Sequence, residues 1–204
     1  MHVSFTDGVC LIVGLGNPEP EYAGTRHNVG ADAVRSLVWR LGLTMSSRRF
    51  NGESARSVFH GCPTVFLCPL TYMNLSGQSV KACADYYRIP LGAILVVHDD
   101  IDLPLERLKA TAGGGAGGHK GVASVIRHLG SGDFPRLKIG IGRPRFGEPV
   151  DRYVLSRFYA DEAEIVERVL QAADEGCERF VVEGIERLMN QINRRLIHKT
   201  EVQD

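Results

Sequence analysis

Apolar positions along this chain alternate between short continuous runs and longer stretches with helical spacing. Continuous apolar runs are typical of buried strands, whereas apolar residues three or four positions apart are typical of one helix face. The alternation therefore predicts an α/β domain, in which helices cover a sheet. The predicted strands are Val9–Leu15, Ser57–His60, Thr64–Pro69, Ile94–His98, Arg107–Thr111 and Leu137–Ile141.

Helical spacing predicts three helices between these strands and two more after the last strand. The second helix is expected to end before Pro90, because proline disfavours helical dihedral angles in the residue before it. The two closing helices each carry one apolar stripe and no candidate chemistry. The predicted helices are Asn28–Leu41, Ser76–Arg88 and His119–Leu129, followed by stripes from Val166 to Val181 and from Ile185 to Leu196.

The connections between these elements indicate how the domain is organised. Residues Gly61–Pro63 separate two strands closely enough to predict a hairpin, which makes the sheet mixed. Residues 1–204 are expected to form one domain, since this length supports one buried core and neither repeats nor linkers divide the chain. The predicted fold class is α/β, a single domain with a twisted mixed β-sheet flanked by helices. The glycine-rich stretch Gly113–Gly118 is expected to be a loop on the working surface.

Composition limits the function and the location of the protein. Lys plus Arg and Asp plus Glu are both 24, so the neutral chain argues against wholesale adsorption to nucleic acid or membrane, and any basic surface must be local. Five cysteines without the spacing of a zinc or redox site fit reduced, buried thiols. No apolar run approaches the roughly 20 residues of a membrane span, and the N-terminus lacks a secretory pattern. We expect a soluble, cytoplasmic protein.

Three segments that follow predicted strands carry candidate chemistry. Leu11–Gly30 contains His27, while Thr71–Gly77 and Val97–Pro104 add an amide and carboxylates. Ligands of open α/β sheets gather outside the carboxyl ends of the strands, which makes Asp99 the natural partner of His27. A histidine titrates near about 6.5 and can take a proton from water if a carboxylate stabilises the imidazolium. Without an obvious partner serine, this pair predicts direct attack by water rather than a covalent intermediate.

Two asparagines and the glycine loop add recognition chemistry. Asn17 and Asn74 each offer a donor and an acceptor without charge, which suits an amide-bearing substrate. The glycine loop could bring backbone N–H groups to a developing oxyanion. Each candidate also has a structural alternative. His27 could be structural or exposed, Asp99 a turn former, Asn74 a helix N-cap and Asn17 a turn residue.

Nucleotide and metal sites are less well supported by the sequence. Gly14–Gly16 opens like a dinucleotide fingerprint, but Glu19 occupies the position of the third glycine, between prolines that disrupt a helix start. No G-x-x-x-x-G-K-[ST] motif occurs. Adjacent residues of a strand point to opposite faces, so the acidic cluster after the fourth strand cannot converge on one ion. That cluster comprises His98, Asp99, Asp100 and Asp102. We expect no cofactor and no metal.

Five blocks of the sequence resemble one family. The chain carries, in order, GLGNPEPEYAGTRHNVG, PLTYMNLSGQSV, ILVVHDDIDLP, GGGAGGHKGVASVI and FPRLKIGIGRP. In this order and with these separations, the blocks are similar to the bacterial-type peptidyl-tRNA hydrolases, and the match runs from Cys10 or so to Phe158. The resemblance implies a monomeric, metal-independent enzyme. Its reaction would cleave the ester between a peptide, or an N-blocked aminoacyl group, and the 3′ end of tRNA, so that peptidyl-tRNA is recycled.

The resemblance also implies roles for individual residues. His27 would be the catalytic base, Asp99 would hold its basic form, and Asn17 would help to discriminate blocked from free aminoacyl groups. Substrate contacts would come from Tyr22, Tyr72 and Asn74, with Met73 lining the cleft. Contacts to the 5′ phosphate of the tRNA would come from Lys109 and Lys138, with Arg136, Arg143 and Arg145 either extending this patch or forming a solvated strand end.

Lys120 departs from the family pattern. It stands where the family usually has Asn in the motif G-G-H-N-G, and Thr111 replaces a second basic position near Lys109. Two outcomes are open. Lys120 could reach a phosphate or the developing oxyanion and keep activity, or it could mark a catalytically weakened relative retained for binding tRNA or other RNA. Because the remaining catalytic and amide residues are present, we expect an active enzyme.

Overall fold

The computed structural model describes residues 8–194 and contains one mixed six-stranded sheet. Its strands are β1 (Cys10–Gly14), β2 (Gly52–Phe59), β3 (Cys62–Pro69), β4 (Ile94–Asp100), β5 (Leu108–Thr111) and β6 (Arg136–Gly140). They lie in the order β2-β3-β1-β4-β6-β5. The four inner strands are parallel, whereas the edge strands β2 and β5 run antiparallel to their neighbours. The predicted mixed sheet is confirmed.

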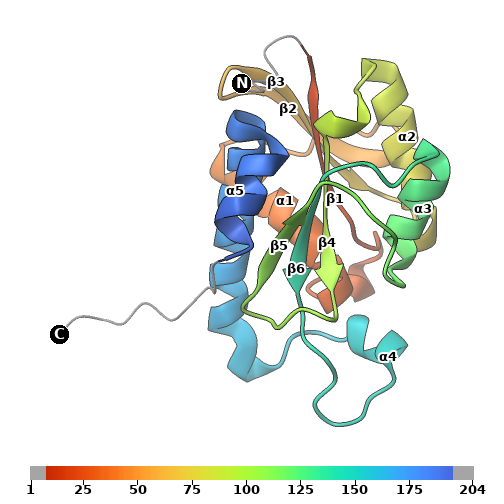
Figure 1. Cartoon of the computed structure of the whole chain (residues 1–204). Coiled ribbons are helices and arrows are strands. Elements are labelled where there is room, and N and C mark those ends of the chain that lie inside the picture. Colours follow the sequence, from red (N-terminus) through yellow and green to blue (C-terminus); the bar gives the residue numbers. More distant parts are fainter. Residues whose placement is uncertain (1–7, 195–204) are drawn as a thin grey trace.

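Helices cover both faces of this sheet. Helices α1 (Val29–Arg40) and α5 (Ala163–Ile192) pack on one face, and α2 (Ser76–Tyr87) and α3 (Lys120–Leu129) pack on the other (Figure 1). The short helix α4 (Val150–Val154) lies beyond the sheet edge at which β4 ends. Short 3-10 turns are η1 (Pro20–Tyr22), η2 (Arg26–Asn28), η3 (Met73–Leu75), η4 (Leu91–Ala93) and η5 (Ala160–Glu162). Within residues 8–194, no helix has the length and apolarity needed to cross a bilayer.

The central strands are buried on both faces, which explains their continuous apolar runs. Ile12 packs with the α1 and α5 side chains, whereas its neighbours Leu11 and Val13 pack with the α2 and α3 side chains. A strand whose two faces are both covered needs apolar residues at every position. All five cysteines lie in this interior as free thiols, and burial raises the pKa of Cys68 to about 12.

The structure differs from the sequence prediction at β2 and at α4, a short helix that the apolar pattern does not predict. β2 begins at Gly52 rather than Ser57, because an edge strand with polar residues on one side lacks a continuous apolar run. The two predicted closing helices are present and together make up α5, meeting at Gly184, where φ is 77° and ψ is 177°. Because glycine tolerates this positive φ, the helix changes direction at Gly184 without a loop, and the apolar stripe changes with it. The predicted end at Leu196 lies outside the described residues.

Close packing of α1 brings the segment before it against the end of β4. A Cβ atom at Gly30 would lie 2.3 Å from the Val97 carbonyl oxygen, and one at Gly14 would lie 2.5 Å from the Gly30 carbonyl oxygen. Only glycine permits this approach of helix to sheet. β1 and β4 lie at the point where the strand order reverses, and ligand sites of open α/β sheets form there. This packing therefore places η2, which contains His27, at the expected site.

A buried acid between α1 and α5 gives a prediction about stability. The Asp174 carboxylate accepts hydrogen bonds from Ser36 Oγ and Arg40 Nε, each at 3.4 Å. Burial raises the pKa of Asp174 to about 6. Since this exceeds the unfolded value of about 3.9, ionisation of Asp174 destabilises the folded state as the pH rises from 4 to 7.

Asp174→Asn is therefore expected to raise the free energy of unfolding at pH 7.5 by about 1 to 2 kcal/mol. The gain should vanish near pH 4, where Asp174 is protonated in the folded protein. Urea denaturation at both pH values measures the effect, with Glu175→Gln as the exposed control on the same helix. Loss of stability at both pH values would mean that the hydrogen bonds outweigh the cost of burying the charge.

Candidate active site

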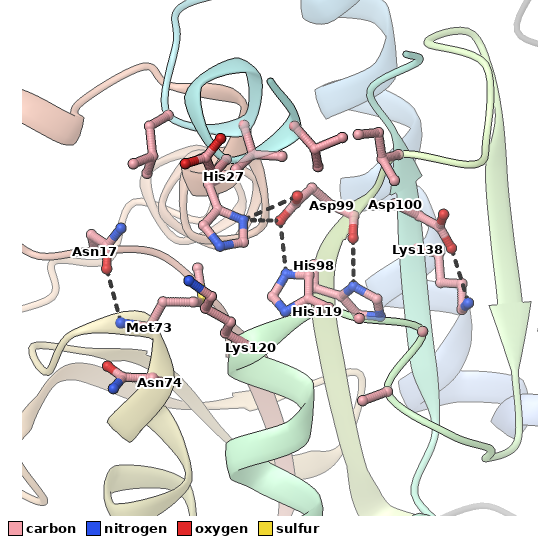
Figure 2. Close-up of a pocket in the computed structure, with 18 of the residues that line it drawn as sticks. Asn17, His27, Met73, Asn74, His98, Asp99, Asp100, His119, Lys120 and Lys138 are labelled. Atoms are coloured by element: carbon pink, nitrogen blue, oxygen red, sulfur yellow. Dashed lines mark hydrogen bonds and ion pairs between the residues drawn. The ribbon is translucent and has the colours of Figure 1, made fainter. Parts of the chain in front are cut away.

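A pocket of about 900 Å³ opens beyond the carboxyl ends of the central strands (Figure 2). The loops after β1, β3 and β4, the start of α3 and one side of α4 form its wall. Of the residues that the sequence predicts for the site, all but Lys109 line this pocket. They are Asn17, Tyr22, His27, Tyr72, Met73, Asn74, Asp99, Lys120 and Lys138.

Asp99 lies between two imidazole rings at the centre of the pocket. Its carboxylate oxygens are 2.9 and 3.0 Å from His27 Nδ1, and Oδ1 is also 2.8 Å from His119 Nε2. Burial opposes ionisation of Asp99, but the two imidazoles outweigh it and hold the pKa of this carboxyl well below its usual range. Asp99 is therefore ionised at neutral pH. An ionised carboxylate only accepts hydrogen bonds, so both ring nitrogens donate to it.

These hydrogen bonds leave one nitrogen available for proton transfer. His27 carries its proton on Nδ1, and its Nε2 lone pair has no partner among residues 8–194. His119 has no free nitrogen, since its Nδ1 accepts from the backbone N–H groups of Gly121 and Val122, at 3.1 and 3.2 Å. The site thus pairs one free imidazole with one that is fully bonded. His27 is buried rather than exposed, and Asp99 lies in β4 rather than in a turn, so these two alternatives are wrong.

His119 is a site residue that sequence reasoning missed. The helical pattern places it only at the start of a helix, and it does cap α3. Histidine is not among the residues that normally fill an N-cap, which are Ser, Thr, Asp and Asn. An N-cap histidine after a glycine-rich loop is the one signal in the sequence that could have marked it.

Asn17 is held by hydrogen bonds from two loops. Its backbone N–H donates to Asn28 Oδ1 at 2.8 Å, and its carbonyl accepts from Asn28 Nδ2 at 2.9 Å. Its side-chain Oδ1 accepts the backbone N–H of Met73 at 2.8 Å, which leaves the NH₂ group as the free half of the amide. Asn17 is therefore more than a turn residue. The N-cap alternative for Asn74 is wrong, because no side chain caps η3 or α2.

Arg26, in the same turn as His27, fixes this turn against the segment before α5. The Arg26 guanidinium is fully buried and lies 4.3 Å from the Tyr153 ring centroid, 4.7 Å from that of Phe158 and 4.6 Å from that of Tyr159. Its Nη2 is 2.7 Å from Glu162 Oε2. The buried positive charge is thus balanced by three aromatic faces and one carboxylate. The sequence patterns do not predict this cluster around Arg26.

The three basic residues of β5 and β6 have different surroundings. Lys138 Nζ is 2.9 Å from Asp100 Oδ2, and this bond outweighs burial in lowering the pKa of Asp100. Lys109 pairs with Lys138 in the strand register, so both lie on one face of the sheet, although Lys109 is exposed and outside the pocket wall. Arg136 is buried and donates to glycine-loop carbonyls, so both readings of it as a surface residue are wrong.

Arg143 and Arg145 remain at the surface, each beside an acid. Arg143 pairs with Asp102, and Arg145 pairs with Asp161 and Glu162. These ion pairs occupy the guanidinium groups, which favours a solvated strand end over a free phosphate site.

His27, Asp99 and His119 are also a set of the kind that can hold a metal ion, with ligand atoms within 4.8 Å of one another. A metal would need lone pairs on nitrogens that here carry protons donated to Asp99.

His98, the third histidine of the pocket wall, is hydrogen-bonded to the backbone rather than to the Asp99 carboxylate. Its Nδ1 donates to the Asp99 carbonyl at 2.7 Å, and burial lowers the pKa of His98 to about 3, so the ring is neutral.

Comparison with known proteins identifies the family. The sequence profile of the peptidyl-tRNA hydrolases matches residues 11–201. The chain belongs to this family. Peptidyl-tRNA hydrolase of Synechococcus sp. (strain JA-2-3B'a(2-13)) is 47% identical over 184 residues, which cover 90% of this chain and 82% of the relative. The corresponding protein of Bacillus cytotoxicus is 42% identical over 183 residues, covering 90% of this chain and 98% of the relative.

Solved structures agree with this assignment. The crystal structure of peptidyl-tRNA hydrolase from Acinetobacter baumannii superposes with a TM-score of 0.87 at 37% identity, covering 97% of this chain and 100% of that chain. The predicted peptidyl-tRNA hydrolase family and fold class are confirmed. These relatives all carry the hydrolase name, so the alternative of a non-catalytic RNA-binding relative gains no support.

Proposed function

We propose that this protein, acting as one domain over residues 1–204, hydrolyses the ester that links a peptide or N-blocked aminoacyl group to the 3′ end of tRNA. The observation that carries the proposal is the free Nε2 of His27, oriented by Asp99 in a pocket at the strand ends. Family membership supports the substrate class. The proposed reaction uses no metal and no cofactor.

The proposed chemistry begins with a water molecule between His27 and the ester. His27 Nε2 takes a proton from this water while the water oxygen attacks the ester carbonyl carbon. The ionised Asp99 stabilises the resulting imidazolium of His27. The tetrahedral intermediate then expels the 3′ oxygen of the terminal ribose. That oxygen takes the proton back from His27, so the products are the free acid and tRNA, and the enzyme is regenerated.

The remaining pocket residues are proposed to position the substrate. The free NH₂ group of Asn17 suits the carbonyl oxygen of a blocked α-nitrogen, because an amide donor cannot bond to an ammonium. Buried Met73 supplies an apolar wall beside it. Tyr22, Tyr72 and Asn74 are proposed to contact the substrate at the exposed side of the pocket.

Lys138, with Lys109 beside it, is proposed to bind the 5′ phosphate of the tRNA. Lys138→Ala should therefore raise KM with little change in kcat, and should reduce the slope of log KM against log salt by about 0.7 to 0.9 for one lost phosphate contact. Steady-state kinetics between 50 and 200 mM salt measure both effects. Lys81→Ala on α2, outside the pocket wall, is the control. An unchanged salt slope would remove Lys138 from the phosphate site.

The decisive experiment compares N-acetyl-aminoacyl-tRNA with free aminoacyl-tRNA as substrates of the purified chain. We expect release of the blocked amino acid, little release of the free one, and the same rates after treatment with a chelator. Binding of tRNA without turnover would instead support an RNA-binding relative. We also propose a cytoplasmic monomer, so sedimentation should give about the chain mass of 22.4 kDa.

A further inference from the structure

Lys120 brings an unpaired positive charge to the pocket. It is the first residue of α3, it is exposed, and its side chain points into the pocket (Figure 2). Within residues 8–194, its ammonium group has no hydrogen bond or ion pair. Lys138, the other lysine of the pocket wall, is paired with Asp100. Among residues 8–194, Lys120 is thus the lysine of the pocket wall whose ammonium group has no counter-ion.

The position of Lys120 does not serve the stability of α3. The N-terminus of a helix carries a partial positive charge, so a cation there is unfavourable. The first turn of α3 contains no acidic residue that would compensate. The acids Asp99, Asp100 and Asp102 of the pocket wall bond to other partners, and Asp151 lies on α4. A cation kept where it weakens its own helix indicates a role in the pocket.

Asn17 gives the same region of the pocket a second donor. Its Oδ1 is occupied by the backbone N–H of Met73, so it offers only N–H groups to a ligand. Lys120 likewise offers only N–H donors, with a full positive charge. Figure 2 shows both side chains in one part of the pocket, next to Met73. Such a surface favours a carbonyl oxygen and disfavours a cation.

We propose that Lys120 is a specificity-determining residue that rejects substrates with a free α-ammonium group. This inference rests on the proposed function. A peptidyl or N-blocked group has an uncharged amide at its α-nitrogen, whereas a free aminoacyl ester is an ammonium below a pH of about 8. A positive charge on Lys120 repels a second positive charge in the same partly desolvated pocket, and we expect this repulsion to change kcat/KM by about tenfold.

The test compares kcat/KM for N-acetyl-aminoacyl-tRNA and free aminoacyl-tRNA in the unmodified protein, Lys120→Gln and Lys120→Arg. Rates are corrected for spontaneous ester hydrolysis. Lys120→Gln should lower the ratio of the two values by about tenfold, mainly by faster hydrolysis of the free aminoacyl ester. Lys120→Arg should keep the ratio because it keeps the charge. Lys81→Gln on α2 is the control for loss of a distant charge.

A pH series separates this electrostatic role from a structural one. In the unmodified protein the ratio should fall between pH 6.5 and 9, as the α-ammonium of the substrate loses its proton, whereas in Lys120→Gln it should change less. An unaltered ratio in Lys120→Gln would overturn the inference, as would an equal loss of activity on both substrates. Failure of the unmodified protein to cleave the blocked substrate would instead overturn the proposed function.

Discussion

His27→Ala is expected to lower kcat for N-acetyl-aminoacyl-tRNA by about 10²- to 10⁴-fold, the usual contribution of a general base. The effect should be this large because His27 Nε2 is the free imidazole nitrogen beside Asp99, while His119 uses both of its nitrogens. KM should change little, since His27 is proposed to act on water rather than to bind tRNA. Single-turnover rates with labelled substrate measure the loss.

His60→Ala is the matched control for this variant. His60 is an exposed histidine on the β2–β3 turn, pairs with Glu178 and does not line the pocket. It should retain full activity. If His27→Ala also retained activity, water would have to be activated by another group, and the proposed mechanism would fail.

Glu162→Gln is expected to lower the free energy of unfolding by about 3 kcal/mol, because it leaves a buried charge without its counter-ion. The Arg26 guanidinium would keep its aromatic neighbours but lose the carboxylate at 2.7 Å. The glutamine oxygen can still accept the backbone N–H of Tyr159, so the change removes charge rather than the cap. Urea denaturation at pH 7 measures the loss.

Two further variants isolate the buried pair. Asp161→Asn removes a carboxylate that is exposed and pairs with Arg145, so it should change stability by less than about 0.5 kcal/mol. The double change Arg26→Met with Glu162→Gln should recover part of the loss, since no unpaired charge remains. Equal stability of Glu162→Gln and the unmodified protein would mean that the aromatic faces alone can hold the Arg26 charge.

Strands buried on both faces were predictable from sequence over most of their length, whereas the edge strand β2 was predictable only in part. β1 and β4 are continuous apolar runs because helices cover both sides of them. β2 was found only in its second half, since its solvent side carries polar residues such as Arg56. No loop separates the two helical parts of α5 at Gly184, and therefore only the change of apolar stripe indicated the break.

The pairing of His27 with Asp99 could also be predicted, because strand ends in an α/β sheet meet at one edge. The residues that hold Asp99 and Asn17 in place could not be predicted. His119 is hydrogen-bonded to Asp99, 20 positions away, and Asn28 is hydrogen-bonded to Asn17, 11 positions away. Such contacts depend on loop conformations that no local pattern encodes. Arg26 is the extreme case, because its aromatic partners come from the segment before α5.

That separation along the chain has a consequence for biosynthesis. All strands are complete at Gly140, yet the rings and the carboxylate that surround Arg26 come from Tyr153 to Glu162. The turn that holds His27 therefore cannot be immobilised until residues beyond the last strand have been synthesised. We therefore expect catalytic competence only late in translation, after residues up to Glu162 have emerged from the ribosome.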